Sequence, residues 1–228
     1  IECLRRQGIQ EIILIIGHLG HKIREYFGDG ATFGVKISYI EETEPLGTAG
    51  ALSMLPEQLT GPSFFLIFGD VLFDIDLERM RQFHEKQAAA TLFVHPNVHP
   101  FDSDLVVCDA AGRVQRFDSK HNVRDYWYQN CVNAGFYLMD RSICDRVPKG
   151  QKTDLEKDIL SAMIADGAAV YGYRSPEYIK DVGTVERIRR AEQELTSGFI
   201  AGKNLNKPQR AIFLDRDGTI NRKNGLVY

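Results

Sequence analysis

Residues Ser63–Asp70 read SFFLIFGD, and this stretch indicates the fold class. A short, almost wholly apolar run that ends in Gly-Asp is typical of a strand buried on both faces of a parallel sheet. A second run of this kind, EIILIIG at Glu11–Gly17, lies upstream, and amphipathic helical patterns alternate with the apolar runs. The sequence therefore predicts an α/β fold with a Rossmann-like, doubly wound, mostly parallel sheet and helices on both faces.

The other predicted elements follow from the same alternation. Further strands are expected at Val35–Glu41, Val132–Met139 and Ala168–Tyr173, and helices at His21–Phe27, Gly47–Leu55, Asp76–Gln87, Asp154–Asp166 and Thr184–Thr196. Three short strands with Pro- or Gly-containing turns between them predict a small antiparallel excursion: Thr91–His95, Asp104–Cys108 and Val114–Phe117. A Gly-, Asn- and Lys-containing linker is expected over 197–209, followed by a buried strand at Arg210–Asp215.

Length and composition exclude several classes of protein. The chain has 228 residues, of which 43% are hydrophobic and 26% charged, a balance too apolar for a disordered chain. Its net charge of −3 argues against nucleic acid or an anionic membrane as a partner. The longest uncharged run, 87–101, is shorter than a membrane-spanning helix. Four scattered cysteines without a C-x-x-C pair indicate reduced thiols of a cytoplasmic protein.

A Gly-rich string, Glu44–Ala51 (EPLGTAGA), is the first group that could bind a ligand. It places Gly47 and Gly50 at the mouth of a predicted helix, where small residues let backbone N–H groups approach a nucleotide closely. Tight helix–sheet packing would explain the same residues, because short glycine motifs are weak signals. Both interpretations stay open at this point.

Two aspartates in distant segments form the second group. Asp70 follows the buried strand at the sheet edge where ligands bind in open α/β folds, and Asp181 lies in the string KDVGT. Together they could hold Mg²⁺ against phosphate, since one or two carboxylates typically suffice for this ion. Capping is the alternative: Asp74 and Asp76 share the loop of Asp70, and Thr184 would serve as the N-cap of the next helix.

The string AIFLDRDGTIN at Ala211–Asn221 is more specific. An apolar strand is followed by Asp215 and Asp217, two residues apart, and then by Gly-Thr. One carboxylate could attack phosphorus to form an aspartyl-phosphate while its neighbour relays the proton. The string therefore favours aspartyl-phosphate chemistry in the tail.

In order and spacing, the strings between GIQEIILIIG (8–17) and IKDVGTVERI (179–188) resemble the sugar-phosphate nucleotidylyltransferases. The tail resembles the start of a haloacid-dehalogenase-type phosphatase of the histidinol-phosphate and heptose-bisphosphate group. The resemblance implies three parts: a nucleotidylyltransferase domain at 1–196, a linker at 197–209, and the first strand and motif of an α/β phosphatase at 210–228. Such a fusion is similar to the bifunctional enzymes of activated heptose synthesis.

The resemblance also implies roles for individual residues. Nucleoside contacts would come from Gly47, Thr48, Ala49 and Gly50, and Mg²⁺ would be bound by Asp70 and Asp181. The sugar pocket would contain Asn133, Gly135 and Glu156, and the sugar phosphate would lie near Lys157 and Lys120. In the tail, Asp215 would be the phosphatase nucleophile and Asp217 its acid/base, and both would bind metal.

The implied activity is transfer of a nucleoside monophosphate from a nucleoside triphosphate, GTP foremost, to a sugar 1-phosphate such as heptose 1-phosphate. The family's glycine-rich opening loop has no counterpart within residues 1–30, and the tail ends before any later acidic or lysine motif of the phosphatases, so we expect this chain to be inactive in both reactions. A non-catalytic sugar-nucleotide-binding regulatory subunit is the main alternative. The base, the sugar and the oligomeric state are not determined by these residues, and a homo-oligomer stays open.

Overall fold

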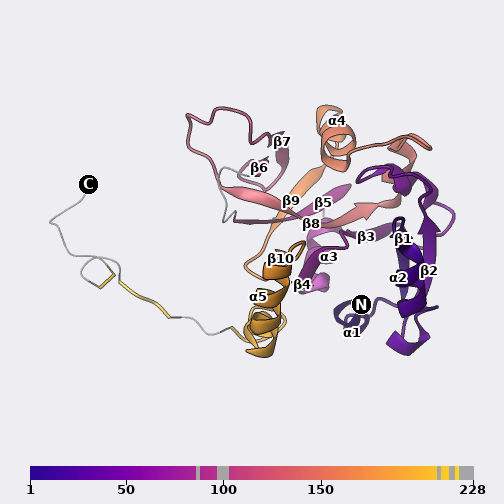
Figure 1. Cartoon of the computed structure of the whole chain (residues 1–228). Coiled ribbons are helices and arrows are strands. Elements are labelled where there is room, and N and C mark those ends of the chain that lie inside the picture. Colours follow the sequence, from indigo (N-terminus) through magenta and orange to yellow (C-terminus); the bar gives the residue numbers. More distant parts are fainter. Residues whose placement is uncertain (86–87, 97–102, 210–211, 216–218, 221–228) are drawn as a thin grey trace.

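A four-stranded sheet in the order β3-β8-β5-β9 forms the centre of the molecule. The computed structural model describes residues 1–85, 88–96, 103–209, 212–215 and 219–220 (Figure 1). The strands are β3 (Ser63–Ile67), β8 (Cys131–Asp140), β5 (Ala90–Pro96) and β9 (Val170–Arg174). β8 is antiparallel to both neighbours and β5 is parallel to β9, so three of the four strands run in one direction. The predicted mostly parallel α/β sheet is confirmed.

A parallel pair of strands, β1 (Glu11–Ile16) and β2 (Lys36–Glu41), lies beside this sheet at the edge formed by β3 (Figure 1). The side chain of Thr60, just before β3, donates a hydrogen bond to Glu11 Oε2 at 3.3 Å. α1 (Glu2–Arg6) precedes β1, and α2 (Gly20–Phe27) and a 3₁₀ turn at Ala31–Phe33 connect β1 to β2.

The central sheet carries a separate hydrophobic core on each face, as alternation along its strands requires. Leu92 on β5 and Tyr137 on β8 pack on one face, against the 3₁₀ helix η2 (Gly50–Met54), the π-helix η4 (Leu155–Leu160) and α4 (Ser161–Ala165). Phe93 and Phe136 pack on the other face, against α3 (Leu77–Glu85). Helices therefore cover both faces of the sheet, because successive side chains of the same strands point to opposite faces.

Two short strands that the sequence pattern did not predict form an antiparallel ribbon. β4 (Val71–Asp74) pairs with β10 (Tyr178–Asp181), and both are too short and too mixed in composition to stand out. The expected antiparallel excursion is smaller than predicted. Only β6 (Leu105–Cys108) and β7 (Val114–Asp118) form a separate hairpin, because Thr91–His95 belongs to β5 inside the central sheet.

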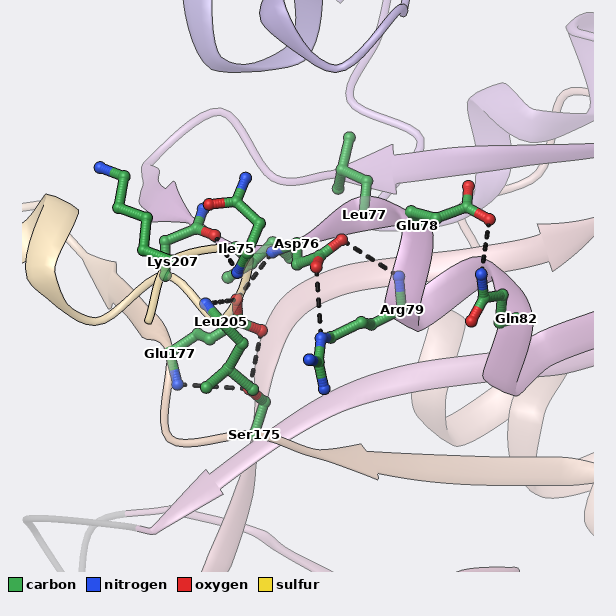
Figure 2. Close-up of polar contacts among 12 residues, drawn as sticks. Ile75, Asp76, Leu77, Glu78, Arg79, Gln82, Ser175, Glu177, Leu205 and Lys207 are labelled. Atoms are coloured by element: carbon green, nitrogen blue, oxygen red, sulfur yellow. Dashed lines mark hydrogen bonds and ion pairs between the residues drawn. The ribbon is translucent and has the colours of Figure 1, made fainter. Parts of the chain in front are cut away.

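The region expected as a linker, 197–209, packs against the domain. α5 (Val185–Thr196) is followed by α6 (Phe199–Gly202) and by a turn around Asn204. Glu177, which is 5% exposed, accepts hydrogen bonds from the backbone N–H groups of Asp76 and Leu205 at 2.8 and 2.9 Å (Figure 2). The Asn204 side chain, also buried, donates to Asp74 Oδ1 at 2.7 Å. Residues far apart in sequence are thus joined by buried polar contacts.

The tail differs from the expected buried strand at Arg210–Asp215. Its described part, Ile212–Asp215, has no regular secondary structure and is exposed, because no strand among the described residues pairs with it. Within the described parts of the chain, no helix has the length and apolar character needed to cross a membrane.

Candidate active site

The β4–β10 ribbon brings the two predicted metal-binding aspartates together. Asp70 directly precedes β4 and Asp181 ends β10, where it is paired in register with Val71. The backbone N–H of Val182 donates to the Asp70 carbonyl oxygen at 2.7 Å, which holds the two chain segments side by side. Both aspartates are exposed to solvent at the end of the ribbon. The 110 residues of sequence between them, 71–180, form a loop that this ladder closes.

Gly183 leaves space between the two carboxylates. A Cβ at this position would lie 3.0 Å from Asp181 Oδ1 and 3.7 Å from Asp70 Oδ2, so any side chain would occupy the region that both oxygens border. Carboxylate oxygens are the ligands that Mg²⁺ prefers, and this ion commonly takes one or two from the protein and the rest from phosphate and water. The residues present therefore fit Mg²⁺. No group of three or more His, Cys, Asp or Glu suited to a metal ion occurs among the described residues.

A bulge in β8 shapes the next part of the site. The pairing of β8 with β5 shifts between Tyr137 and Asn133, and Gly135 inside the shift has φ +71°. A Cβ on Gly135 would lie 2.9 Å from the Phe68 ring, so glycine is required for both its backbone conformation and its close contact. The Gly135 carbonyl accepts from Phe68 N–H at 2.9 Å, two residues before Asp70.

The bulge aims Asn133 at a half-buried carboxylate. The Asn133 side-chain amide donates to Glu156 Oε1 at 2.6 Å and also hydrogen-bonds the hydroxyl of Tyr137, which is fully buried. Burial raises the pKa of Glu156, the hydrogen bond from Asn133 acts in the opposite direction, and the nearby carboxylates of Asp154 and Asp104 raise it further. Burial likewise raises the pKa of Tyr137 well above its ordinary value. Glu156 is thus a half-buried acceptor that the Asn133 amide holds in place.

Glu156 and Lys157 lie in the first turn of η4, where a helix had been expected. Asp154 caps this turn, because its Oδ1 accepts from the N–H groups of Glu156 and Lys157 at 3.0 and 2.9 Å. The segment is a π-helix, a form that often occurs at functional sites. Lys157 is exposed, so its ammonium group is available to an anion.

The Gly-rich turn packs directly against this segment. The Thr48 hydroxyl accepts from Leu155 N–H at 2.8 Å, and Thr153 exchanges backbone hydrogen bonds with Leu46 and Ala49. A Cβ on Gly47 or Gly50 would lie 2.6 Å from a carbonyl oxygen of the 151–153 segment, so packing requires both glycines. Gly47 and Thr48 are exposed, whereas Ala49 and Gly50 are buried. The packing interpretation accounts for all four residues, and nucleoside contact stays a prediction.

The remaining predicted residues lie at the margin of this group or outside it. Lys120 is exposed in the turn after β7, and its N–H donates to Asp104, a carboxylate that acts on the pKa of Glu156. Asp215 is exposed in the tail, and Asp217 lies outside the described residues. Contacts between neighbouring segments therefore connect five separate parts of the sequence. The predicted site residues in these segments are Thr48, Asp70, Asn133, Gly135, Glu156, Lys157 and Asp181.

Three residues at the site were not predicted to belong to it. Tyr137 contacts Asn133 but reads as an ordinary core aromatic of its strand. Gly183 separates the carboxylates, and Arg187 forms an ion pair with Asp181 at 2.6 Å. For Arg187, the i+6 spacing from Asp181 across a helix N-cap was the signal available in the sequence.

The fold and this arrangement define the class of protein: the chain has the nucleotide-diphospho-sugar transferase fold. Residues 1–198 match the family described as Nucleotidyl transferase, and the chain belongs to this family. HddC from Yersinia pseudotuberculosis has a similar fold, with a TM-score of 0.71 at 20% sequence identity over 85% of this chain and 82% of that one. The same protein complexed with GMP-PN gives a TM-score of 0.70.

Relatives of known activity are more similar in sequence. The chain is 32% identical to mannose-1-phosphate guanylyltransferase of Mycobacterium tuberculosis over 92% of its own length and 58% of that protein. It is also 32% identical to D-glycero-alpha-D-manno-heptose 1-phosphate guanylyltransferase of Aneurinibacillus thermoaerophilus, over 84% of this chain and 81% of that protein. The chain thus spans little more than half of the Mycobacterium relative and most of the Aneurinibacillus one.

Proposed function

We propose that this chain forms the core of a sugar 1-phosphate guanylyltransferase. The observation that carries the proposal is the continuous group of contacts from Thr48 through Glu156, Asn133 and Gly135 to Asp70 and Asp181. It combines the hydrogen-bonded pair of Asn133 and Glu156, an exposed lysine and a pair of exposed carboxylates. Guanylyl transfer is also the activity for which two relatives at 32% identity are named.

The proposed reaction is a phosphoryl substitution. A phosphate oxygen of the sugar 1-phosphate attacks the α-phosphorus of GTP, the bond from that phosphorus to the bridging oxygen breaks, and pyrophosphate leaves. No covalent enzyme intermediate is required, so catalysis consists of in-line positioning and neutralisation of charge. In this proposal Lys157, with Lys120 at the margin, attracts the sugar phosphate, and Glu156 with Asn133 orients the sugar hydroxyls.

Asp70 and Asp181 would hold Mg²⁺ across the space that Gly183 leaves. When bound, the ion would neutralise developing negative charge on the phosphates. Among sugars we favour D-glycero-D-manno-heptose 1-phosphate, because a relative at 32% identity is named for this substrate and the tail resembles the start of a heptose-bisphosphate phosphatase. The unpaired cysteines support action in the cytoplasm.

We further propose that the competent enzyme has one more strand, between β1 and β3. Among the described residues, β1 pairs only with β2 and β3 only with β8, and the apolar residues of both strands are left half-exposed. A pocket of about 610 Å³ is lined by Phe65 of β3, by Ile9 just before β1 and by residues at the start of α3. A strand there would place the loop after it at the same sheet edge as Asp70, where a triphosphate-binding loop is needed. The 228-residue chain alone is therefore proposed to be inactive.

The phosphatase part remains a second component of the proposal. Ile212, Phe213 and Leu214 are 83%, 96% and 62% exposed, which is the state expected of a strand whose own sheet is not present. We propose that in a bifunctional parent this strand is buried in a phosphatase domain and carries Asp215 as nucleophile, with Asp217 two residues on.

Pyrophosphate release tests the transferase. GTP, ATP or CTP is supplied with heptose 1-phosphate or mannose 1-phosphate to the 228-residue chain and to the protein from the complete reading frame that contains it. We expect no turnover from the first and the fastest turnover with GTP and heptose 1-phosphate from the second. In the longer protein, Asp70→Asn and Asp181→Asn should each lower kcat about a hundredfold or more. Asp215→Asn should leave transfer unchanged and abolish phosphate release from heptose bisphosphate.

Ordinary turnover by the 228-residue chain would overturn the proposal of an additional strand. Binding of a GDP-sugar without turnover in either protein would contradict the transferase and favour a regulatory sugar-nucleotide-binding subunit.

A further inference from the structure

Asp181 is engaged on both of its carboxylate oxygens. Oδ1 accepts a hydrogen bond from Gly183 N–H at 2.6 Å, and Oδ2 pairs with Arg187 Nη1, also at 2.6 Å. Arg187 lies in the first turn of α5, where its backbone N–H is capped by Thr184 Oγ1 at 3.3 Å. The short connection from β10 to α5 thus fixes where the guanidinium can reach, and it reaches the carboxylate proposed to bind a cation.

The ion pair is strong enough to orient Asp181 but weak enough to open. The side chains of Arg187 and Asp181 are 47% and 53% exposed, and ion pairs this exposed contribute little because water screens them. A guanidinium beside a two-carboxylate site also cancels one of its two negative charges. A divalent cation that approaches Asp181 Oδ2 must therefore compete with Arg187.

We infer that Arg187 is a positioning residue that sets the cation affinity of the Asp70–Asp181 site. It holds Asp181 at the end of β10 while the site has no cation, and it releases Oδ2 when a divalent cation binds. This inference rests on the proposed function, because it takes the two aspartates as the cation site. A purely structural helix-surface role would give Arg187 no influence on cation binding.

Mn²⁺ binding to the 228-residue chain, measured by electron paramagnetic resonance without nucleotide, tests the inference. Removing the competing charge in Arg187→Gln should lower the Kd for Mn²⁺ about three- to fivefold at low ionic strength, and Arg187→Glu should lower it further. Arg187→Lys keeps the charge, so its Kd for Mn²⁺ should stay close to that of the unsubstituted 228-residue chain. The gain in Arg187→Gln should shrink at 0.5 M salt, because the charges lie near the surface.

Arg189→Gln is the matched control, since it removes the same charge from an exposed position two residues along α5, away from the Arg187 face. It should change the Kd by less than twofold. If Mn²⁺ binds and Asp181→Asn abolishes the binding, but Arg187→Gln leaves it unchanged or weakens it, the inference about Arg187 is overturned alone. If the parent chain binds no Mn²⁺, or Asp181→Asn has no effect, the proposed cation site itself fails.

Discussion

Glu156 is the residue at which burial and chemistry are most closely connected. Its carboxylate accepts from Asn133 at 2.6 Å inside a wall that also contains the buried Tyr137. Burial raises its pKa above the ordinary value of 4.5, so ionisation costs more free energy in the folded chain than in the unfolded one. The contribution of Glu156 to stability is therefore largest at low pH and is lost as the pH rises through the raised pKa.

Glu156→Gln should remove this pH dependence while the amide oxygen keeps the hydrogen bond from Asn133. We compare the melting temperatures of the variant and of the unsubstituted chain at each pH. The difference, variant minus unsubstituted chain, should increase by about 1–3 °C between pH 4 and pH 7. Differential scanning calorimetry across this range measures it. Glu57→Gln, at an exposed carboxyl, is the control and should give a flat difference. A flat difference for Glu156→Gln as well would mean that burial does not perturb this group.

At the scale of elements, β1 and β3 each have one backbone edge with which no strand of the described residues pairs. The backbone carbonyl oxygens of Gln10 and Ile16 accept hydrogen bonds from residues in and just after β2. In a strand, the N–H and C=O groups of one residue point the same way. The backbone groups of the even-numbered residues of β1 therefore point to β2. The backbone groups of Pro62 and Phe68, which flank β3 and are also even-numbered, form hydrogen bonds with residues in and just after β8. The backbone groups of Ile13 and Phe65 therefore point to the edges that lack a strand.

Hydrogen exchange should distinguish these edges residue by residue. In the 228-residue chain, the amides of Ile13 and Phe65 should exchange at least tenfold faster than those of Leu14 and Leu66, their neighbours in the paired direction. NMR-detected exchange measures all four. In the longer protein from the complete reading frame, the first two amides should become protected. Equal protection of neighbours in the 228-residue chain would contradict an open position between the strands.

At the scale of the whole molecule, Glu177 connects the end of the chain to its body. One carboxylate joins the N-terminus of α3, through Asp76 N–H, to the backbone of Leu205, and it also accepts from Ser175 Oγ at 2.8 Å (Figure 2). The contacts from Asp76 and Ser175 are buried and the one from Leu205 is part-buried, so loss of the acceptor is costly. The contacts explain why residues beyond α5 pack on the domain although their composition is that of a linker.

Glu177→Ala should lower the free energy of unfolding by about 2–4 kcal/mol, because the buried N–H of Asp76 and the part-buried N–H of Leu205 lose their acceptor. Glu177→Gln is the matched variant, since its oxygen can still accept from both groups, and it should lose about 1 kcal/mol or less. Urea denaturation measures both, and limited proteolysis should cleave Glu177→Ala faster near residue 205. Equal stability of the alanine and glutamine variants would refute this anchoring role.

Much of the fold could be predicted from local pattern. The strands at Glu11–Gly17 and Ser63–Asp70 and the helix at Thr184–Thr196 appear within a few residues of their expected positions, because apolar period and capping residues are local signals. The direction of β8, the central place of β5 and the β4–β10 ribbon could not, because strand order and short pairings depend on residues distant in sequence. The bulge at Gly135 could not be predicted either, because it is defined only by the pairing of β8 with β5.

By itself, the sequence determined that this protein is an α/β chain with Asp70, Asn133, Glu156 and Asp181 in the order of the nucleotidylyltransferase family. These features depend on residue type and spacing, which the chain carries locally. Only the tertiary structure decided which of them meet. It joined Asp70 to Asp181 through the β4–β10 ladder, placed Arg187 on Asp181, and gave the glycines of 47–50 a packing role, because each contact closes a long loop in the chain.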